Sequence, residues 1–432
     1  MKNKIKKIFD GESGSIFKGM IVLFIGTGLS RVLGILCIPI LTRIYTPEDY
    51  GVLALYVSFM TILAPVLTLR YVQAIPLPKT DTLAMNLLVL CLLLILADTA
   101  LLTLILGSFK EVIFPFFSME KLSPWWGLVI LGAFGTALYE LLTFWATRKK
   151  QYKLISKAQF SQSFISNSTK IFLGLLSMST LGLISGQFLA QTSGISGLMK
   201  SCFADYKLVC SKINIKRIIF LAKYYKDFVL FRLPSQILLA VSVQAPVLMM
   251  ASLYNQDITG QLSLAFMALS LPATLIGQSV SRAYYGEVAS IGKSNIKKIK
   301  VITTDVQKKL FHVGIPITII MVFFSQPAFK IVFGPEWGKA GLYAEMMSPY
   351  ILMQLTSGPL VQVLNILGSQ VVYLIINFSR IFGLVVIYYI SHEFKFDEND
   401  FVLYISLYLF AFYLIITFAI NKMINDSVRL NE

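Results

Sequence analysis

Apolar stretches of roughly 20 residues recur along the whole chain, each long enough to cross the hydrocarbon core of a bilayer as a helix. Soluble globular proteins carry about 25% charged residues. This chain of 432 residues carries 14%, with 56% hydrophobic residues and a mean hydropathy of +0.72. The sequence therefore predicts an all-α polytopic membrane protein of about 12 transmembrane helices. The predicted spans are 17–41, 50–69, 82–106, 124–146, 156–177, 181–199, 227–251, 259–281, 310–333, 341–364, 371–391 and 401–421.

The spans divide into two halves at the long polar stretch 201–226. A weak internal repeat supports this division, because Tyr, Gly and Leu occur at the same spacing in Tyr45–Leu55 and in Tyr254–Leu264. We expect two six-helix bundles around a central cavity, formed by residues 1–211 and 212–432. With an even number of spans in each half, the bundles are parallel repeats, an arrangement known among transporters.

The net charge of +16 is distributed unevenly between the two sides of the membrane. Most Lys and Arg residues fall in loops on the side of the N-terminus, above all in 200–226 and 282–309. The positive-inside rule then predicts that both termini are cytoplasmic. The first span is expected to stay as a membrane anchor, because its apolar core of about 25 residues is longer than that of a signal peptide and no A-x-A cleavage motif follows it. These basic loops are expected to lie near anionic membrane lipids, and no nucleic-acid partner is expected.

No residue pattern indicates an enzyme. The chain has four scattered cysteines and two histidines, without a C-x-x-C pair or a histidine cluster, so neither a disulfide framework nor a metal site is predicted. Phosphate-binding loops, nucleophile motifs and paired carboxylates are also missing from the sequence, and no cofactor is expected.

Polar residues recur at three- and four-residue steps in the predicted fifth, sixth and tenth spans, which places them on one face of each helix, and Asn377 lies one turn before Arg380 in the eleventh. Such a face would leave amides without partners in lipid, so it must meet protein or water. Two interpretations stay open, namely a cavity lining and hydrogen bonds between helices. The candidate cavity-lining residues are Gln159, Asn167, Gln191, Gln354, Gln362, Asn365 and Asn377.

Ionisable residues lie within the predicted spans, where each charge costs about 2.5–3.5 kcal/mol and needs a partner or a cavity. The bases outnumber the acids, which predicts an anionic ligand, and phosphate suits arginine well. Arg232 lies close enough to the inner surface to snorkel. Asp98 and Glu140 are candidates for coupling to a proton or sodium gradient, or else for structural ion pairs. The embedded residues are the bases Arg31, Lys170, Arg232 and Arg380 and the acids Asp98 and Glu140.

Three segments resemble a known family, the Wzx-like polysaccharide flippases of the multidrug/oligosaccharidyl-lipid/polysaccharide exporter superfamily. They are Pro39–Gly51 (PILTRIYTPEDYG), Leu69–Pro78 (LRYVQAIPLP) and Leu271–Ser281 (LPATLIGQSVS), the last followed by Tyr285–Glu287. The resemblance implies the fold of the multidrug and toxin extrusion (MATE) proteins of that superfamily. It also implies a flippase that moves an undecaprenyl-pyrophosphate-linked oligosaccharide to the outer leaflet of the bacterial inner membrane. The cargo would be an O-antigen (lipopolysaccharide) or capsule repeat unit, and other proteins of glycan assembly would be partners.

Three other functions fit the sequence less well. A cation-coupled multidrug exporter of the same superfamily would favour an acidic cavity, and the basic surplus argues against it. A membrane glycan polymerase or ligase commonly carries a large outer loop, which the chain lacks. A membrane scaffold would leave the polar helix faces unexplained.

Overall fold

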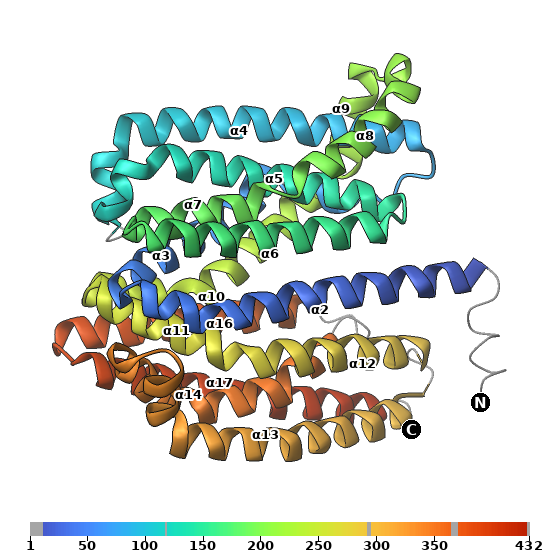
Figure 1. Cartoon of the computed structure of the whole chain (residues 1–432). Helices are drawn as coiled ribbons and strands as arrows, with labels where there is room; N and C mark the ends of the chain where they lie inside the picture. Colours follow the sequence, from blue (N-terminus) through green and yellow to red (C-terminus); the bar gives the residue numbers. More distant parts are fainter. Residues whose placement is uncertain (1–11, 117–118, 292–294, 364–369, 430–432) are drawn as a thin grey trace. The chain divides into compact units, whose positions relative to one another are not determined.

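The computed structural model describes residues 12–116, 119–291, 295–363 and 370–429. The side chains of residues 12–25 are not described. The described residues form helices joined by short connections and contain no strand (Figure 1). The prediction of an all-α fold is therefore confirmed.

The chain divides into two compact units, residues 1–240 and 241–432, and helix α10 contributes to both. The division predicted between residues 211 and 212 stays a prediction. The helices of unit 1 are α2 (Glu12–Ile44), α3 (Pro47–Leu67), η1 (Tyr71–Ala74), α4 (Asp81–Phe116), η2 (Glu120–Trp125), α5 (Trp126–Arg148), α6 (Tyr152–Leu175), α7 (Ser179–Thr192), α8 (Ile195–Val209), η3 (Cys210–Lys212), α9 (Ile215–Tyr224), η4 (Phe228–Arg232) and the first part of α10 (Leu233–Leu253).

Unit 2 repeats the plan of long helices packed side by side, with α14 packed against α11, α13 and α17. Its helices after α10 are α11 (Gln256–Pro272), η5 (Ala273–Gly277), α12 (Gln278–Ile291), α13 (Ile296–Val332), η7 (Pro335–Trp337), α14 (Gly338–Ser357), η8 (Gly358–Gln362), α16 (Gln370–Glu393) and α17 (Glu398–Arg429).

Eight helices within the described residues are long and apolar enough to cross a membrane. They coincide with the predicted spans one to four, seven, nine, eleven and twelve. The chain is therefore a multi-pass membrane protein. The eight helices are Gly26–Ile44, Pro47–Leu67, Asp81–Phe116, Glu120–Arg148, Phe228–Leu253, Ile296–Val332, Ile375–Glu393 and Glu398–Arg429.

The other four predicted spans are also helical, as α6, α7, α11 and α14, but they are more polar or shorter. Helix α7 has 14 residues, and α11 has 17 before the π-helical turn η5 interrupts it. Helix α6 is long but carries a row of hydroxyl and amide groups, which lowers its hydropathy. The count of about 12 spans accordingly stays a prediction.

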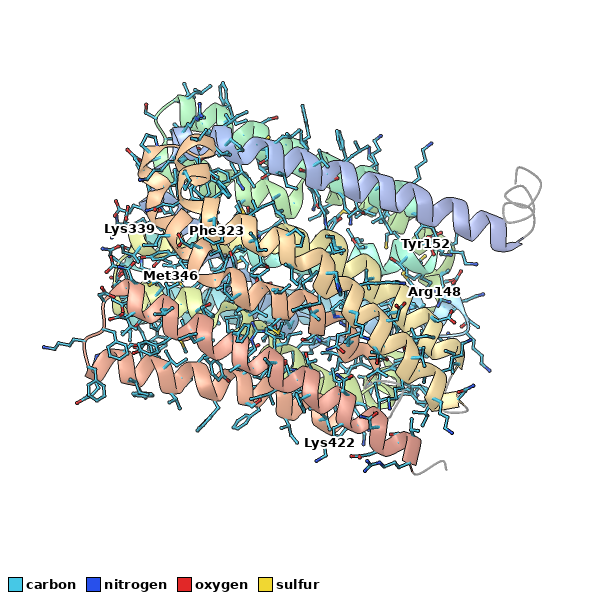
Figure 2. All side chains as sticks on the ribbon, turned by 90° about the horizontal axis from the view of Figure 1, so that it is seen from below. Arg148, Tyr152, Phe323, Lys339, Met346 and Lys422 are labelled. Carbon is cyan, nitrogen blue, oxygen red and sulfur yellow. The ribbon has the colours of Figure 1, made fainter. Side chains whose placement is uncertain are left out.

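Large apolar side chains cover the outside of several long helices. Leu104 of α4 is 69% exposed, Phe323 of α13 is 72% exposed and Phe418 of α17 is 74% exposed (Phe323 is labelled in Figure 2). A soluble protein rarely leaves large contiguous apolar surfaces in water. These surfaces are suited to contact with lipid.

The first segment of the family resemblance forms a helix start. Thr46 and Asp49 make a capping box, in which the Thr46 hydroxyl accepts from the Asp49 backbone N–H and the Asp49 carboxylate accepts from the Thr46 N–H. Pro47 occupies the first helical position, where its missing N–H costs no hydrogen bond. The buried Asp49 also accepts a hydrogen bond from Thr180 at 2.5 Å, which ties the start of α3 to α7.

The internal repeat has a counterpart in the hydrogen bonds. Tyr45, just before α3, donates its hydroxyl to the Lys170 carbonyl of α6 at 2.6 Å. Tyr254, just before α11, donates to the Phe396 carbonyl that follows α16 at 3.0 Å. Each unit thus has a tyrosine before its second predicted span that binds a main-chain carbonyl. In unit 1 the carbonyl belongs to the fifth predicted span of that unit, and in unit 2 it lies just after the corresponding span.

Helices α13 and α14 approach closely at a glycine. A Cβ atom added at Gly341 of α14 would lie 2.6 Å from the Gln326 Cα and 2.9 Å from the Ser325 carbonyl oxygen. Both neighbours are backbone atoms of α13, so they cannot move aside as a flexible side chain could. Small residues at such contacts let helix backbones approach in membranes.

We expect Gly341→Ala to destabilise the protein by about 1–3 kcal/mol, because the added methyl group forces the two helices apart. Gly28→Ala in α2 is the matched control, since a Cβ there meets nothing within 4 Å and alanine favours a helix over glycine. Thermal unfolding of the two detergent-solubilised variants measures the difference. Equal melting temperatures would contradict the packing argument.

Candidate functional site

Lys170 is a buried cation of unit 1. It lies on α6, is 8% exposed, and donates from Nζ to the Gln187 Oε1 of α7 at 2.9 Å. Gly186 leaves room for its stem, because a Cβ there would lie 2.3 Å from the Lys170 Cγ. The ammonium is therefore held between α6 and α7 by an amide and not by a carboxylate.

Arg380 is a buried cation in unit 2. It lies on α16, is 8% exposed, and its guanidinium carbon lies 5.7 Å from the centre of the Tyr413 ring. Its Nε is buried without a hydrogen-bond partner. Tyr413 in turn stacks on Tyr350 at 6.2 Å and accepts a hydrogen bond from the Gln354 amide at 3.1 Å. Aromatic faces stabilise a guanidinium without neutralising it.

Lys170 and Arg380 both lie on the fifth predicted span of their unit, Lys170 towards the end of α6 and Arg380 near the middle of α16. Within the described residues, neither forms an ion pair with a carboxylate. Burying a charge costs several kcal/mol unless it is paired. Each unit therefore maintains one buried positive charge that could still interact with an anion.

The other two predicted cations are exposed on their own units. Arg31 lies on α2 with an exposed side chain. Arg232 lies in the π-helical turn η4 and donates from Nε to the Gln73 Oε1 at 3.2 Å. They differ from Lys170 and Arg380 in being surrounded by less protein.

Most of the predicted polar lining is engaged in contacts within a unit. The Gln159 carbonyl oxygen accepts from Thr27 of α2 at 2.7 Å, and Gln191 accepts from the Tyr56 hydroxyl at 3.0 Å. Asn167 donates to the Ser163 carbonyl of its own helix at 2.8 Å. The polar face of α6 therefore serves, at least in part, to bind α2.

The remaining lining candidates belong to unit 2. Gln354 binds Tyr413, as described above, and Asn377 is buried one turn before Arg380. The side chain of Gln362 and the whole of Asn365 lie outside the described residues. The cavity-lining role of these amides stays a prediction.

The two candidate coupling acids have different surroundings. Glu140 of α5 forms an ion pair with Arg70 at 2.7 Å, and the two side chains are 24% and 12% exposed. Its partner is thus none of the four predicted cations. Asp98 of α4 is half-buried, and its Oδ2 is buried without a hydrogen-bond partner.

Arg70 is the residue that the sequence analysis did not single out. It follows α3 in the left-handed conformation (φ 60°) and donates both to Glu140 and, at 2.8 Å, to the Gln236 of α10. Gln73, three residues later, accepts from Arg232. The segment Leu69–Pro78 that resembles the flippases therefore joins α5 to the start of α10. Arg70 lies inside this conspicuous sequence segment, and that position was the sequence signal that could have identified it.

Comparison with known proteins identifies the family. A model of the polysaccharide biosynthesis protein family matches residues 40–341, which is more than half of the chain. The chain belongs to this family, as the resemblance predicted. A comparison with curated proteins gives no significant match.

Solved structures confirm the predicted MATE-like fold. A multidrug resistance MATE transporter in an inward-facing conformation matches with a TM-score of 0.75 and 13% identity, over 92% of this chain and 95% of that one. The lipid II flippase MurJ matches with a TM-score of 0.70 and 14% identity, over 93% and 87%. A point mutant of the Vibrio cholerae MATE transporter VcmN matches with a TM-score of 0.60 and 15% identity, over 96% of both chains. These proteins are described as transporters or a flippase and not as enzymes, in agreement with the sequence analysis.

The Arg70–Glu140 pair generates a stability prediction. Arg70→Met should destabilise the protein by up to about 3–5 kcal/mol, because it leaves a carboxylate unpaired among the helices. Adding Glu140→Leu should restore much of that stability, since the unpaired charge is then gone. Thermal unfolding of the two single variants and the double variant measures the coupling between the residues.

The exposed pair Lys309–Asp305, whose side chains are 74% and 58% exposed, provides the control. Lys309→Met should cost less than about 1 kcal/mol. If Arg70→Met destabilised the protein as little as Lys309→Met, the Arg70–Glu140 ion pair would not be what holds α5 to the segment Leu69–Pro78.

Proposed function

We propose that the protein is a flippase for an undecaprenyl-pyrophosphate-linked oligosaccharide, moved from the cytoplasmic to the outer leaflet of the bacterial inner membrane. The observation that carries the proposal is the pair of buried cations Lys170 and Arg380, one in each unit of a polysaccharide biosynthesis protein, which form no ion pair among the residues that the structure describes. The cargo would be a repeat unit of O-antigen, capsule or a related polymer. Both termini would be cytoplasmic.

The physical obstacle for such a cargo is its headgroup. A pyrophosphate loses several kcal/mol or more of hydration in hydrocarbon, even after relaxation. Ammonium and guanidinium donors replace that hydration, while the polyprenyl chain stays in lipid. Because Lys170 binds only an amide and Arg380 an aromatic ring, a phosphate can approach them without displacing a carboxylate.

Alternating access would complete the cycle. In transporters built of two repeats, one bundle rocks against the other around a site between them. On this proposal Arg31, Lys170, Arg232 and Arg380 face one shared cavity, with the described amides of α6, α7 and α14 at its margin. Other proteins of glycan assembly would deliver the cargo and receive it.

The alternative is a cation-coupled multidrug exporter. The structural likeness to MATE transporters favours it, since the TM-score of 0.75 with one of them is high. A cationic drug would meet two buried positive charges that, within the described residues, form no ion pair with a carboxylate. The flippase is therefore preferred, and the likeness to MurJ shows that this fold also occurs in a protein named as a lipid II flippase.

For energy coupling we propose Asp98 and Glu140. A carboxylate can exchange a proton or bind sodium as the units change conformation. Asp98 has a buried oxygen without a partner, and Glu140 forms the ion pair that links α5 to the start of α10.

The cargo proposal predicts graded effects in the four cation variants. Arg380→Ala should insert normally and abolish flipping, and Arg380→Lys should keep part of it, since charge survives without the bidentate fork. Lys170→Ala should behave like Arg380→Ala, and Arg31→Ala should also reduce flipping. Arg232→Ala should be milder because this arginine lies close enough to the inner surface to snorkel. Restoration of surface glycan in a deletion strain, at matched membrane levels, measures each effect.

Lys157→Ala is the control, because this lysine lies on the same helix as Lys170 but is exposed. Accumulation of lipid-linked precursor should accompany each loss of surface glycan. Near-normal glycan in the Arg31, Lys170 and Arg380 alanine variants would show that these charges serve helix packing.

The coupling proposal predicts that Asp98→Asn or Glu140→Gln abolishes transport driven by an imposed proton or sodium gradient. Both substitutions keep the size of the side chain and remove its charge. Transport of the lipid-linked oligosaccharide in proteoliposomes is the measurement, with gradient-free exchange as the internal control. If both variants transport at the full rate, the two acids are structural.

A further inference from the structure

A basic pocket lies in unit 2, and none of the candidate cations described above is among its lining residues. Its volume is about 610 Å³, which is within the usual range for a small-molecule site. It is formed by the first part of α13 and the last turn of α17, which run side by side (Figure 1). Its lining includes Lys297, Lys300, Thr304, Asp305, Lys308 and Val428.

One hydrogen bond fixes the register of the two helices at the pocket. Asn421 of α17 donates to the Gln307 Oε1 of α13 at 3.3 Å. From there the antiparallel helices continue together, so that Val428, seven residues after Asn421, comes level with Lys300, seven residues before Gln307. This agrees with the presence of Val428 and Lys300 in one lining.

The same register places the pocket at the edge of the apolar zone. Helix α13 has 37 residues and is therefore about 55 Å long, whereas the hydrocarbon core is about 30 Å thick. The apolar parts of both helices end near Gln307 and Asn421, and Lys422 follows at once (Figure 2). Lys308 and Thr304 thus lie at the depth of lipid headgroups, and Lys300 and Lys297 lie further out.

The charges around the pocket leave a positive excess. Asp305, the acidic residue of the lining, is paired with Lys309 at 2.8 Å. Lys300 and Lys308 form no ion pair within the described part of the chain. An ammonium is a compact point charge that binds phosphate without requiring a bidentate geometry.

We propose that this pocket binds the headgroup of an anionic phospholipid with two phosphodiesters, as in cardiolipin. Lys308 would hold the phosphate nearer the membrane, and Lys297 and Lys300 the other. The exposed Val301 and the half-buried Val428 would contact the glycerol backbone. Basic pockets between transmembrane helices on the cytoplasmic side are suited to such headgroups. The bound lipid would fasten the end of α17 to α13, independently of the transported cargo.

The test measures lipid binding to the full-length protein in detergent by native mass spectrometry, during titration with cardiolipin. A lysine near an anionic surface contributes about fivefold to binding, so three contribute on the order of 100-fold. We expect the variant K297Q/K300Q/K308Q to bind cardiolipin about 10- to 100-fold more weakly. The matched variant K153Q/K157Q/K200Q removes three exposed lysines of unit 1 and should stay within about threefold of the wild type.

Two further arms define the ligand. Phosphatidylcholine should bind both variants alike, which also shows that the pocket variant is folded. Inorganic pyrophosphate should not compete with cardiolipin at equal concentration. Equal cardiolipin binding by the two triple variants would overturn the proposal. Full competition by pyrophosphate would also overturn it, because the pocket would then be a site for soluble phosphate.

Discussion

The constraint on which this structure depends is the lack of water inside a bilayer. Every main-chain N–H and C=O within the hydrocarbon must form its hydrogen bond inside the protein. A helix meets this requirement within a single segment, because all its backbone hydrogen bonds are local. Once the backbone is satisfied in this way, the helices associate through close packing and a few polar contacts. Close packing is seen where Gly341 meets the α13 backbone. A polar contact is seen where the Tyr45 hydroxyl binds the Lys170 carbonyl.

Within that frame the ionisable side chains fall into two kinds. Glu140 and Arg70 form an ion pair, and Arg70 also bonds Gln236, so these two charges connect α5 to the start of α10 even though the Arg70 Nε is buried without a hydrogen-bond partner. Lys170 and Arg380 are buried with only an amide and an aromatic ring as partners, which stabilise a cation less completely than a carboxylate would. Whether a buried charge has an oppositely charged partner, and not the number of charges, separates a structural contact from a candidate anion site.

Particular residues show how far the sequence could predict this arrangement. The buried state of Lys170 and Arg380 follows from the span assignment, and the structure agrees with it. Arg31 and Arg232 were assigned to spans in the same way, but their side chains are exposed. The partner of Glu140 could not be predicted, because Arg70 lies 70 residues away in a loop motif and reaches it only after the helices pack. The polar face of α6 was equally consistent with a cavity and with helix contacts. The bond from Thr27 to Gln159 assigns part of that face to α2.

The sequence by itself determined the class of this protein. Apolar length and composition dictate membrane helices, and motif segments identify the family, because each of these properties is local in the chain or additive over it. The tertiary structure alone decided which polar groups find partners and which do not. That outcome depends on contacts between helices distant in sequence. One example is the hydrogen bond from Asn421 to Gln307, which sets the register of α17 against α13 and so brings the end of α17 beside the lysines of α13.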